Sequence, residues 1–190
     1  MQQAVQSQTN KPLINPAPPA ADAEHVNAIF SSIEQQLGFV PDGVKLYSLS
    51  PPVLDAFLSY VGYFNQGGTP LPKGLPAMIR YLSAWDYGCS FCVDMNEVFL
   101  TGMGFDLDDI RAARNNPDLA PFEKKERTLL KLALKSIETP DDVTQADMNQ
   151  AHEYGWSDRE IFDAVVQAAS NRAFSTVLKT FKIERQGDLN

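Results

Sequence analysis

The chain has 190 residues, is 44% hydrophobic and carries a formal net charge of −8 at pH 7. This length allows one domain with a substantial core, and the acidic balance argues against nucleic acid as a partner, because the basic residues do not cluster free of acidic ones. No apolar run approaches the roughly 20 residues that cross a bilayer, so no membrane partner is expected either.

Residues 1–21 contain four prolines and few large apolar side chains, a composition typical of a flexible arm. The sequence therefore predicts an arm over residues 1–21 and a single helical domain over residues 22–190. The arm has no basic segment followed by an apolar one, so a secretory signal is not expected and the chain is expected in the cytoplasm.

Apolar side chains recur at helical spacing over residues 22–37, and Gly38 ends this first predicted helix. Residues 41–50 are expected to form a connector between the first and second helices. A proline pair at Pro51 opens a second helix, which ends before the glycine pair at Gly67.

A proline-rich loop over residues 69–76 precedes a third helix, which runs to Gly88 and has Trp85 on its expected buried side. A new helical period begins directly after Gly88. The two cysteines of the chain, Cys89 and Cys92, are therefore predicted to lie at a helix N-terminus.

The rest of the chain predicts four more helices, each with a recognisable start. Asp106 and Thr144 are suited to cap two of them, and Glu123 precedes a third. Ser157 and Glu160 match a capping box, in which each side chain bonds the other residue's backbone N–H. Since no strand pattern appears, the predicted fold is all-α, a bundle of about eight helices packed antiparallel over short linkers.

Two cysteines three residues apart lie on one helix face and can close a small, reducible disulfide. The unpaired N–H groups and positive dipole end of a helix N-terminus favour the thiolate, which is the nucleophilic form. In a reducing cytoplasm such a pair is more often redox-active or metal-bound than structural. Zinc would need two more ligands, and only the isolated His25 and His152 remain, so no metal or other cofactor is expected.

Two separated segments stand out, Gly88-Cys89-Ser90-Phe91-Cys92-Val93 and Tyr154-Gly155-Trp156-Ser157-Asp158-Arg159-Glu160-Ile161. They resemble the AhpD-like, or carboxymuconolactone decarboxylase-like, superfamily of alkylhydroperoxidase-related proteins. The first is a CxxC that opens a helix, and the second is a glycine followed by Ser-Asp-x-Glu at the start of the C-terminal helix. The resemblance covers roughly residues 71–181. It implies an all-helical fold, a homo-oligomer (trimer, hexamer or dimer), an organic hydroperoxide as substrate and a thiol or dithiol as reductant.

In redox-active members of that superfamily the second cysteine attacks the peroxide and the first resolves the sulfenic acid, roles that would fall on Cys92 and Cys89. The family's proton relay uses a histidine and a glutamate, whose positions here hold Asn96 and Ala77. Asn96 lies one turn beyond Cys92, where its amide can orient a water or stabilise a thiolate but cannot act as a base. Tyr81, one turn after Ala77, is the candidate replacement, although a core or subunit-contact role is the simpler interpretation.

Four further polar residues near these motifs have ordinary structural interpretations. Asp94 and Glu97 are expected to face solvent, and Asp86 is expected to cap a helix or form a salt bridge. His152 is expected to be a surface or capping residue at a helix end.

Three aromatic residues, Trp85, Tyr87 and Phe91, can line an apolar approach to Cys92 for an organic hydroperoxide. Aromatic residues at helical spacing are more often simply part of a core. Both interpretations stay open from the sequence.

The sequence leaves two functions open. One is a thiol-dependent alkylhydroperoxidase-like antioxidant protein, a peroxidase or disulfide reductase that uses the CxxC pair. The other is a catalytically degenerate oligomeric scaffold or small-ligand-binding protein, which the replacement of both relay residues favours. Carboxymuconolactone decarboxylation is the weakest interpretation, because it acts on an anionic lactone and no cationic acid/base constellation replaces the missing histidine.

Overall fold

Regular structure in the computed structural model of the chain is entirely helical over residues 11–189, the part that the structure describes, which confirms the predicted all-α class. None of the helices in this range is both long and apolar enough to cross a membrane. The α-helices are α1 (Ala23–Leu37), α2 (Asp42–Tyr47), α3 (Pro51–Asn65), α4 (Leu75–Tyr87), α5 (Ser90–Gly102), α6 (Leu107–Ala112), α7 (Lys124–Glu138), α8 (Gln145–Glu153) and α9 (Asp158–Phe181).

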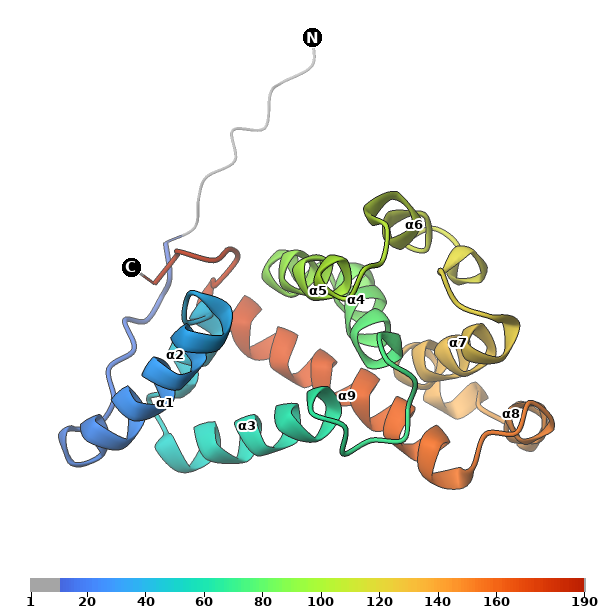
Figure 1. Cartoon of the computed structure of the whole chain (residues 1–190), viewed down its shortest axis with the longest axis horizontal. Coiled ribbons are helices and arrows are strands. Elements are labelled where there is room, and N and C mark those ends of the chain that lie inside the picture. The colour runs from blue at the N-terminus through green and yellow to red at the C-terminus, as the bar shows by residue number, and fades with distance from the viewer. Residues whose placement is uncertain (1–10, 190) are drawn as a thin grey trace, which may run out of the picture.

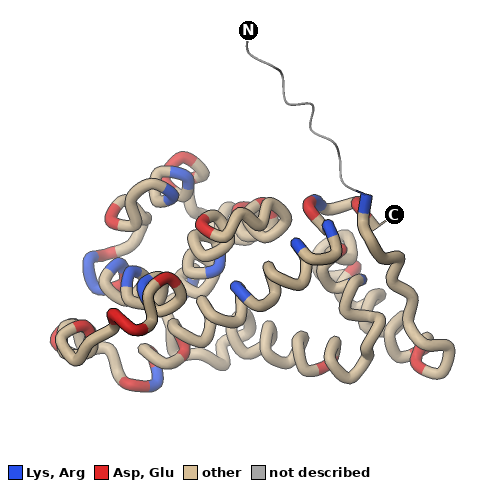
Figure 2. The backbone as a smooth tube through the Cα atoms, turned by 180° about the vertical axis from the view of Figure 1, so that it is seen from behind, with Lys and Arg blue, Asp and Glu red and all other residues tan. Residues whose placement is uncertain are grey.

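The long helix α9 runs through the middle of the molecule, and α4 and α7 pack against it (Figure 1). Helix α4 also packs against α5 and α7, so the CxxC helix is joined to the centre of the bundle. Helices α1 and α2 lie near the C-terminal end of α9, and α7 and α8 lie near its start. Basic residues gather along α7 and recur along α9 (Figure 2).

The main core lies between α4, α5, α7 and α9, and a smaller cluster joins α1, α2 and α3. Burial of each large aliphatic side chain contributes roughly 1.5–3 kcal/mol, so the packing of α4, α7 and α9 supplies much of the stability. Fully buried members of the main core include Leu75, Met78, Ile79, Leu129, Leu130 and Leu178, and the smaller cluster contains Val26, Val44 and Leu54.

Helix starts that were predicted from capping residues are confirmed. The Asp106 carboxylate accepts hydrogen bonds from the first backbone N–H groups of α6. Ser157 and Glu160 form the predicted capping box at α9, and Thr144 forms a second one with Asp147 at α8. Each cap satisfies N–H groups that a helix cannot pair internally.

The predicted connector over residues 41–50 is wrong, because residues 42–47 form the short helix α2. Six residues are too few to show a helical period in sequence. Tertiary packing fixes the helix instead: a Cβ on Gly43 would lie 2.7 Å from Cζ of Phe174, so the Phe174 ring of α9 packs directly against the Gly43 backbone.

The prediction that Trp85 lies on the buried side of its helix is also wrong, since 44% of this residue is exposed. The guanidinium of Arg114 lies 4.1 Å from the centroid of its ring. A cation on an aromatic face stabilises the indole at the protein surface without burying it.

The N-terminal segment lies against the end of α9 where the structure describes it. The backbone N–H of Leu13 donates to the carbonyl oxygen of Phe181 at 3.0 Å, and Ile14 packs against the main core. Residues 1–10 of the predicted arm lie outside the described residues. The division of the chain at residue 21 stays a prediction.

Candidate functional site

The two cysteines lie at the corner where α4 ends and α5 begins. Gly88 adopts a left-handed conformation with φ 70°, which ends α4 and which other residues would adopt only with strain. Cys89 then takes the extended conformation of an N-cap, and Cys92 lies in the first turn of α5. Lys179 Nζ donates to the carbonyl oxygen of Tyr87 at 2.6 Å, which fixes the corner to α9.

A disulfide joins Cys89 and Cys92, whose Cα atoms are 5.3 Å apart. Both residues are 2% exposed, so the sulfurs lie inside the protein. The hydroxyl of Ser175, from α9, donates to Cys92 Sγ at 3.2 Å and is itself fully buried. The position at a helix N-terminus, which favours a thiolate in the reduced protein, is as predicted.

Asn96 is buried one turn beyond Cys92, and both ends of its amide are engaged. Its Nδ2 donates to the carbonyl oxygen of Cys92 at 2.7 Å, and its Oδ1 accepts from Arg80 Nε at 2.9 Å. Burial lowers the pKa of Arg80 to about 10, although the phenol of Tyr60 opposes this shift. The Asn96 amide therefore contacts the Cys92 carbonyl oxygen and Arg80. The side chain that contacts the Cys92 sulfur is Ser175.

Tyr81 belongs to a separate polar cluster between α4, α5 and α6. Its hydroxyl donates to Glu97 Oε1 at 2.8 Å and accepts from Arg114 Nε at 2.6 Å. Burial raises the pKa of Tyr81 to about 12, and the hydrogen bond to Glu97 adds to this shift. Arg111 binds the same carboxylate at 2.9 Å. These contacts join Tyr81 to an ion-pair cluster, and Ala77 lies buried one turn earlier.

The prediction that Glu97 faces solvent is wrong, because its side chain is only 12% exposed. Burial opposes its ionisation, but hydrogen bonds from Arg111 and Tyr81 outweigh it, so the pKa of Glu97 lies below its ordinary value. Because this pKa is lowered, the ionised cluster stabilises the fold fully at a pH above the ordinary pKa of glutamate. The stabilisation is lost as the pH falls through the lowered pKa of Glu97.

Replacing Tyr81 with Phe should lower the free energy of unfolding by about 1 kcal/mol, because one hydroxyl leaves a cluster in which Glu97 and Arg114 still bind each other. Urea denaturation measures this change. We expect no effect on the ionisation of the Cys92 thiol, since the hydrogen bonds of Tyr81 are to Glu97 and Arg114. A shift in that ionisation would instead give Tyr81 the catalytic role considered from the sequence.

Three structural interpretations made from the sequence are confirmed. Asp86 forms a salt bridge with Arg172 at 3.0 Å, and Asp94 is exposed. His152 lies at the end of α8, where its Nδ1 is 2.9 Å from the carbonyl oxygen of Trp156. Within residues 11–189, no three His, Cys, Asp or Glu side chains are grouped closely enough to hold a metal ion.

The three aromatic residues near the CxxC lie in different environments. The Tyr87 ring has Arg172 and Lys179 of α9 each 4.5 Å from its centroid. Phe91 is buried in the main core, whereas Trp85 is exposed beside α6. Core packing therefore accounts for Phe91, and cation contacts account for the other two.

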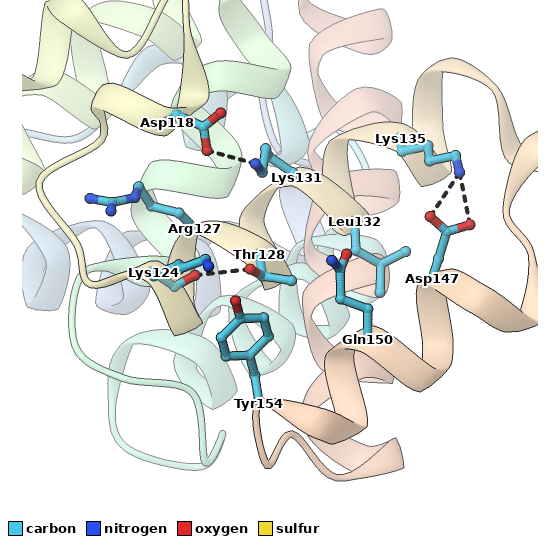
Figure 3. Close-up of a pocket in the computed structure, with 10 residues that line it drawn as sticks. All are labelled: Asp118, Lys124, Arg127, Thr128, Lys131, Leu132, Lys135, Asp147, Gln150 and Tyr154. Atoms are coloured by element: carbon cyan, nitrogen blue, oxygen red, sulfur yellow. Dashed lines mark hydrogen bonds and ion pairs between the residues drawn. The ribbon is translucent and has the colours of Figure 1, made fainter.

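A hollow of about 440 Å³ lies between α7 and α8, apart from the cysteine pair (Figure 3). Lys131 and Lys135, on α7, form ion pairs with Asp118 and Asp147 at its edges. None of the disulfide's neighbours lines this hollow, so it is not part of the candidate site.

The fold is similar to that of an uncharacterised peroxidase-related protein from Silicibacter sp. TM1040, with a TM-score of 0.82 and 18% identity over 94% of this chain and 93% of that one. A peroxidase-related protein from Ralstonia eutropha JMP134, described as an alkylhydroperoxidase AhpD core, gives a TM-score of 0.80 and 22% identity over 94% and 95% of the two chains. This chain has the AhpD-like fold.

The fold is also similar to that of a debrominase. The debrominase Bmp8 matches with a TM-score of 0.63 and 19% identity over 98% of this chain and 96% of that one. No family model matches the chain, and no curated protein matches it in sequence. The comparisons therefore support the fold that was expected from the two sequence segments.

Sequence reasoning missed Ser175, which contacts Cys92 Sγ, and Arg80, which binds Asn96. Ser175 is 83 residues from Cys92 in the chain, so no local motif joins them. A signal was present in the last helix, where polar residues recur at every fourth position among apolar ones. That spacing indicates that the polar residues lie on one face of the helix, and this face is buried in the structure.

Proposed function

We propose that this protein is a dithiol peroxidase in which Cys92 attacks an organic hydroperoxide and Cys89 resolves the product. The observation that carries the proposal is the Cys89–Cys92 disulfide at the N-terminus of α5, in a chain with the AhpD-like fold. The assignment of the two roles follows the resemblance noted in the sequence.

The chemistry balances within the CxxC pair and one external dithiol. The Cys92 thiolate attacks the terminal peroxide oxygen, the O–O bond breaks, and the alkoxide takes a proton from water to leave as an alcohol. The resulting sulfenic acid on Cys92 condenses with the Cys89 thiol, which forms the disulfide and releases water. Thiol–disulfide exchange with a reduced dithiol returns both cysteines and leaves that dithiol oxidised, as expected in a reducing cytoplasm.

The test is consumption of cumene hydroperoxide with dithiothreitol as reductant. The expected result is one oxidised dithiothreitol for each alcohol formed, at a rate above that of dithiothreitol alone. Protein that is reduced first and then freed of reductant should consume one equivalent of hydroperoxide per chain. If the reduced protein consumes none, the peroxidase proposal is wrong.

A second candidate is reductive debromination, which the likeness to the debrominase Bmp8, also solved in complex with 2,3,4-tribromopyrrole, favours. An aryl bromide and two thiols would give the arene, a disulfide and hydrogen bromide, so the CxxC pair supplies both electrons. The same reduced protein should then release bromide from tribromopyrrole. If neither substrate oxidises the cysteines, the catalytically degenerate scaffold becomes the better account.

We also propose that the protein forms a homo-oligomer. The proposal follows the resemblance noted in the sequence, which implies a homo-oligomer; Val98 and Phe162 are large apolar residues that are 56% and 66% exposed. Sedimentation equilibrium should give a mass that is a multiple of the 21.0 kDa chain. A 21.0 kDa species at all concentrations would contradict the proposal.

A further inference from the structure

Four buried polar side chains follow one another at every fourth position of α9. Asp163, Gln167, Asn171 and Ser175 are 5%, 1%, 6% and 0% exposed. Side chains four residues apart lie one above the other on a helix, so these four form a continuous row. We call them the α9 polar row. Burial of polar groups costs free energy unless each has a partner, so their partners indicate what the row does.

The first two members bind α3 and the loop after it. Tyr63 Oη and Thr69 Oγ1 each donate to the Asp163 carboxylate at 2.7 Å. Tyr60 Oη donates to Gln167 Oε1 at 2.9 Å. This half of the row therefore has an ordinary structural explanation, which is attachment of α3 to α9.

The other two members lead to the cysteine pair. Asn171 Nδ2 donates to the carbonyl oxygen of Arg80 at 3.1 Å, and Ser175 Oγ donates to Cys92 Sγ at 3.2 Å. Arg80 in turn binds Asn96, whose amide binds the Cys92 carbonyl. Asn171 and Ser175 of α9 therefore meet polar groups of α4 and α5 in a buried cluster around Cys92.

Arg80 lacks an acidic partner in this cluster. Within the described residues it forms no ion pair, and its side-chain hydrogen bonds go to the amides of Asn96 and Asn65. A guanidinium partly removed from water and without a counter-ion stabilises an anion that forms nearby. Arg80 is linked to Cys92, whose thiolate forms in the reduced protein, through Asn96, which binds the Cys92 carbonyl oxygen.

We propose that Ser175 is a catalytic residue that stabilises the Cys92 thiolate by donating a hydrogen bond to it, in place of the missing histidine. Asn171 and Arg80 are positioning residues: Asn171 ties α9 to α4, and Arg80 holds Asn96 against the first turn of α5. This inference rests on the proposed function, because it assigns the thiolate as the reacting group. Ionisation of Cys92 passes its proton to water, and serine keeps its own proton while donating the hydrogen bond.

The test uses the full chain with Cys89→Ser, which leaves Cys92 as the single thiol. Its ionisation is followed against pH by the ultraviolet absorbance of the thiolate, which requires no reagent to reach the buried sulfur. A hydrogen bond to a charged group contributes on the order of tenfold or more to an equilibrium, so Ser175→Ala should raise the pKa of Cys92 by about one unit. Ser175→Thr, which keeps a hydroxyl, should restore most of the original value.

The matched control is Ser83→Ala. Ser83 is also a fully buried helical serine, but its hydroxyl has no hydrogen-bond partner within the part of the chain that the structure describes. This variant should titrate like the parent. Arg80→Gln should raise the pKa by a smaller amount than Ser175→Ala, and Arg80→Lys should raise it less than Arg80→Gln.

The inference is overturned if Ser175→Ala leaves the titration unchanged or if Ser83→Ala shifts it equally. Circular dichroism checks that each variant is folded, and alanine is well tolerated in a helix. Hydroperoxide consumption is also measured for wild type and for Ser175→Ala with both cysteines present. This measurement separates failure of the peroxidase proposal from failure of the role given to Ser175. If wild type consumes hydroperoxide but the titration does not shift, only the role of Ser175 fails; if no variant consumes it, the peroxidase proposal fails whatever the titration shows.

Discussion

Cys92→Ser should abolish hydroperoxide consumption, with a loss of at least about 10³-fold, which is the order seen when a catalytic nucleophile is removed. A serine hydroxyl at this position stays protonated at neutral pH and is a much weaker nucleophile than a thiolate. Cys89→Ser should behave differently. It should consume one equivalent of hydroperoxide and then stop, because the sulfenic acid on Cys92 has no resolving thiol.

The measurement is the burst of alcohol formed by each reduced variant, together with trapping of the sulfenic acid by dimedone and mass spectrometry. Ser90→Ala is the matched control, since Ser90 is an exposed serine between the two cysteines. It should retain turnover. If Cys89→Ser is inert and Cys92→Ser yields the trapped sulfenic acid, the two roles are exchanged.

The second large effect concerns stability. Asp42→Ala should lower the free energy of unfolding by about 3 kcal/mol, because Asp42 is fully buried and anchors the end of the chain. Its Oδ2 accepts from the backbone N–H groups of Gly187 and Leu189 at 2.7 and 3.0 Å, and its Oδ1 lies 2.9 Å from Lys45 Nζ. Alanine would remove this acceptor while the donors stay in place.

Denaturation by guanidinium chloride, compared with wild type, measures this loss. Asp141→Ala, which removes an exposed carboxylate, is the matched control and should change stability by less than about 0.5 kcal/mol. Equal stability of Asp42→Ala and wild type would show that the segment over residues 184–189 is not held by this carboxylate.

Features of the fold that depend on a few neighbouring residues could be predicted from the sequence. Ser157 and Glu160 act on each other within one turn, and Gly88 ends α4 by its own backbone conformation. The positions of Cys89 and Cys92 at a helix N-terminus follow from the same kind of local pattern. These features were predicted correctly because the interactions that fix them span few residues.

Features that depend on distant segments could not be predicted in this way. Helix α2 is fixed by contact of Gly43 with Phe174, and Glu97 is shielded by Arg114, which follows it by 17 residues. Ser175 reaches Cys92 only because α9 crosses the α4–α5 corner. A residue's environment at such a crossing is a property of the packing and has no local sequence signature.

Burial of the disulfide has a kinetic consequence. With both cysteines 2% exposed, neither an organic hydroperoxide nor a protein reductant contacts a sulfur while the corner at Gly88 is closed. Lys179, which binds the Tyr87 carbonyl, ties this corner to α9. In the proposed cycle, both oxidation and recycling of the cysteines therefore depend on local opening around them.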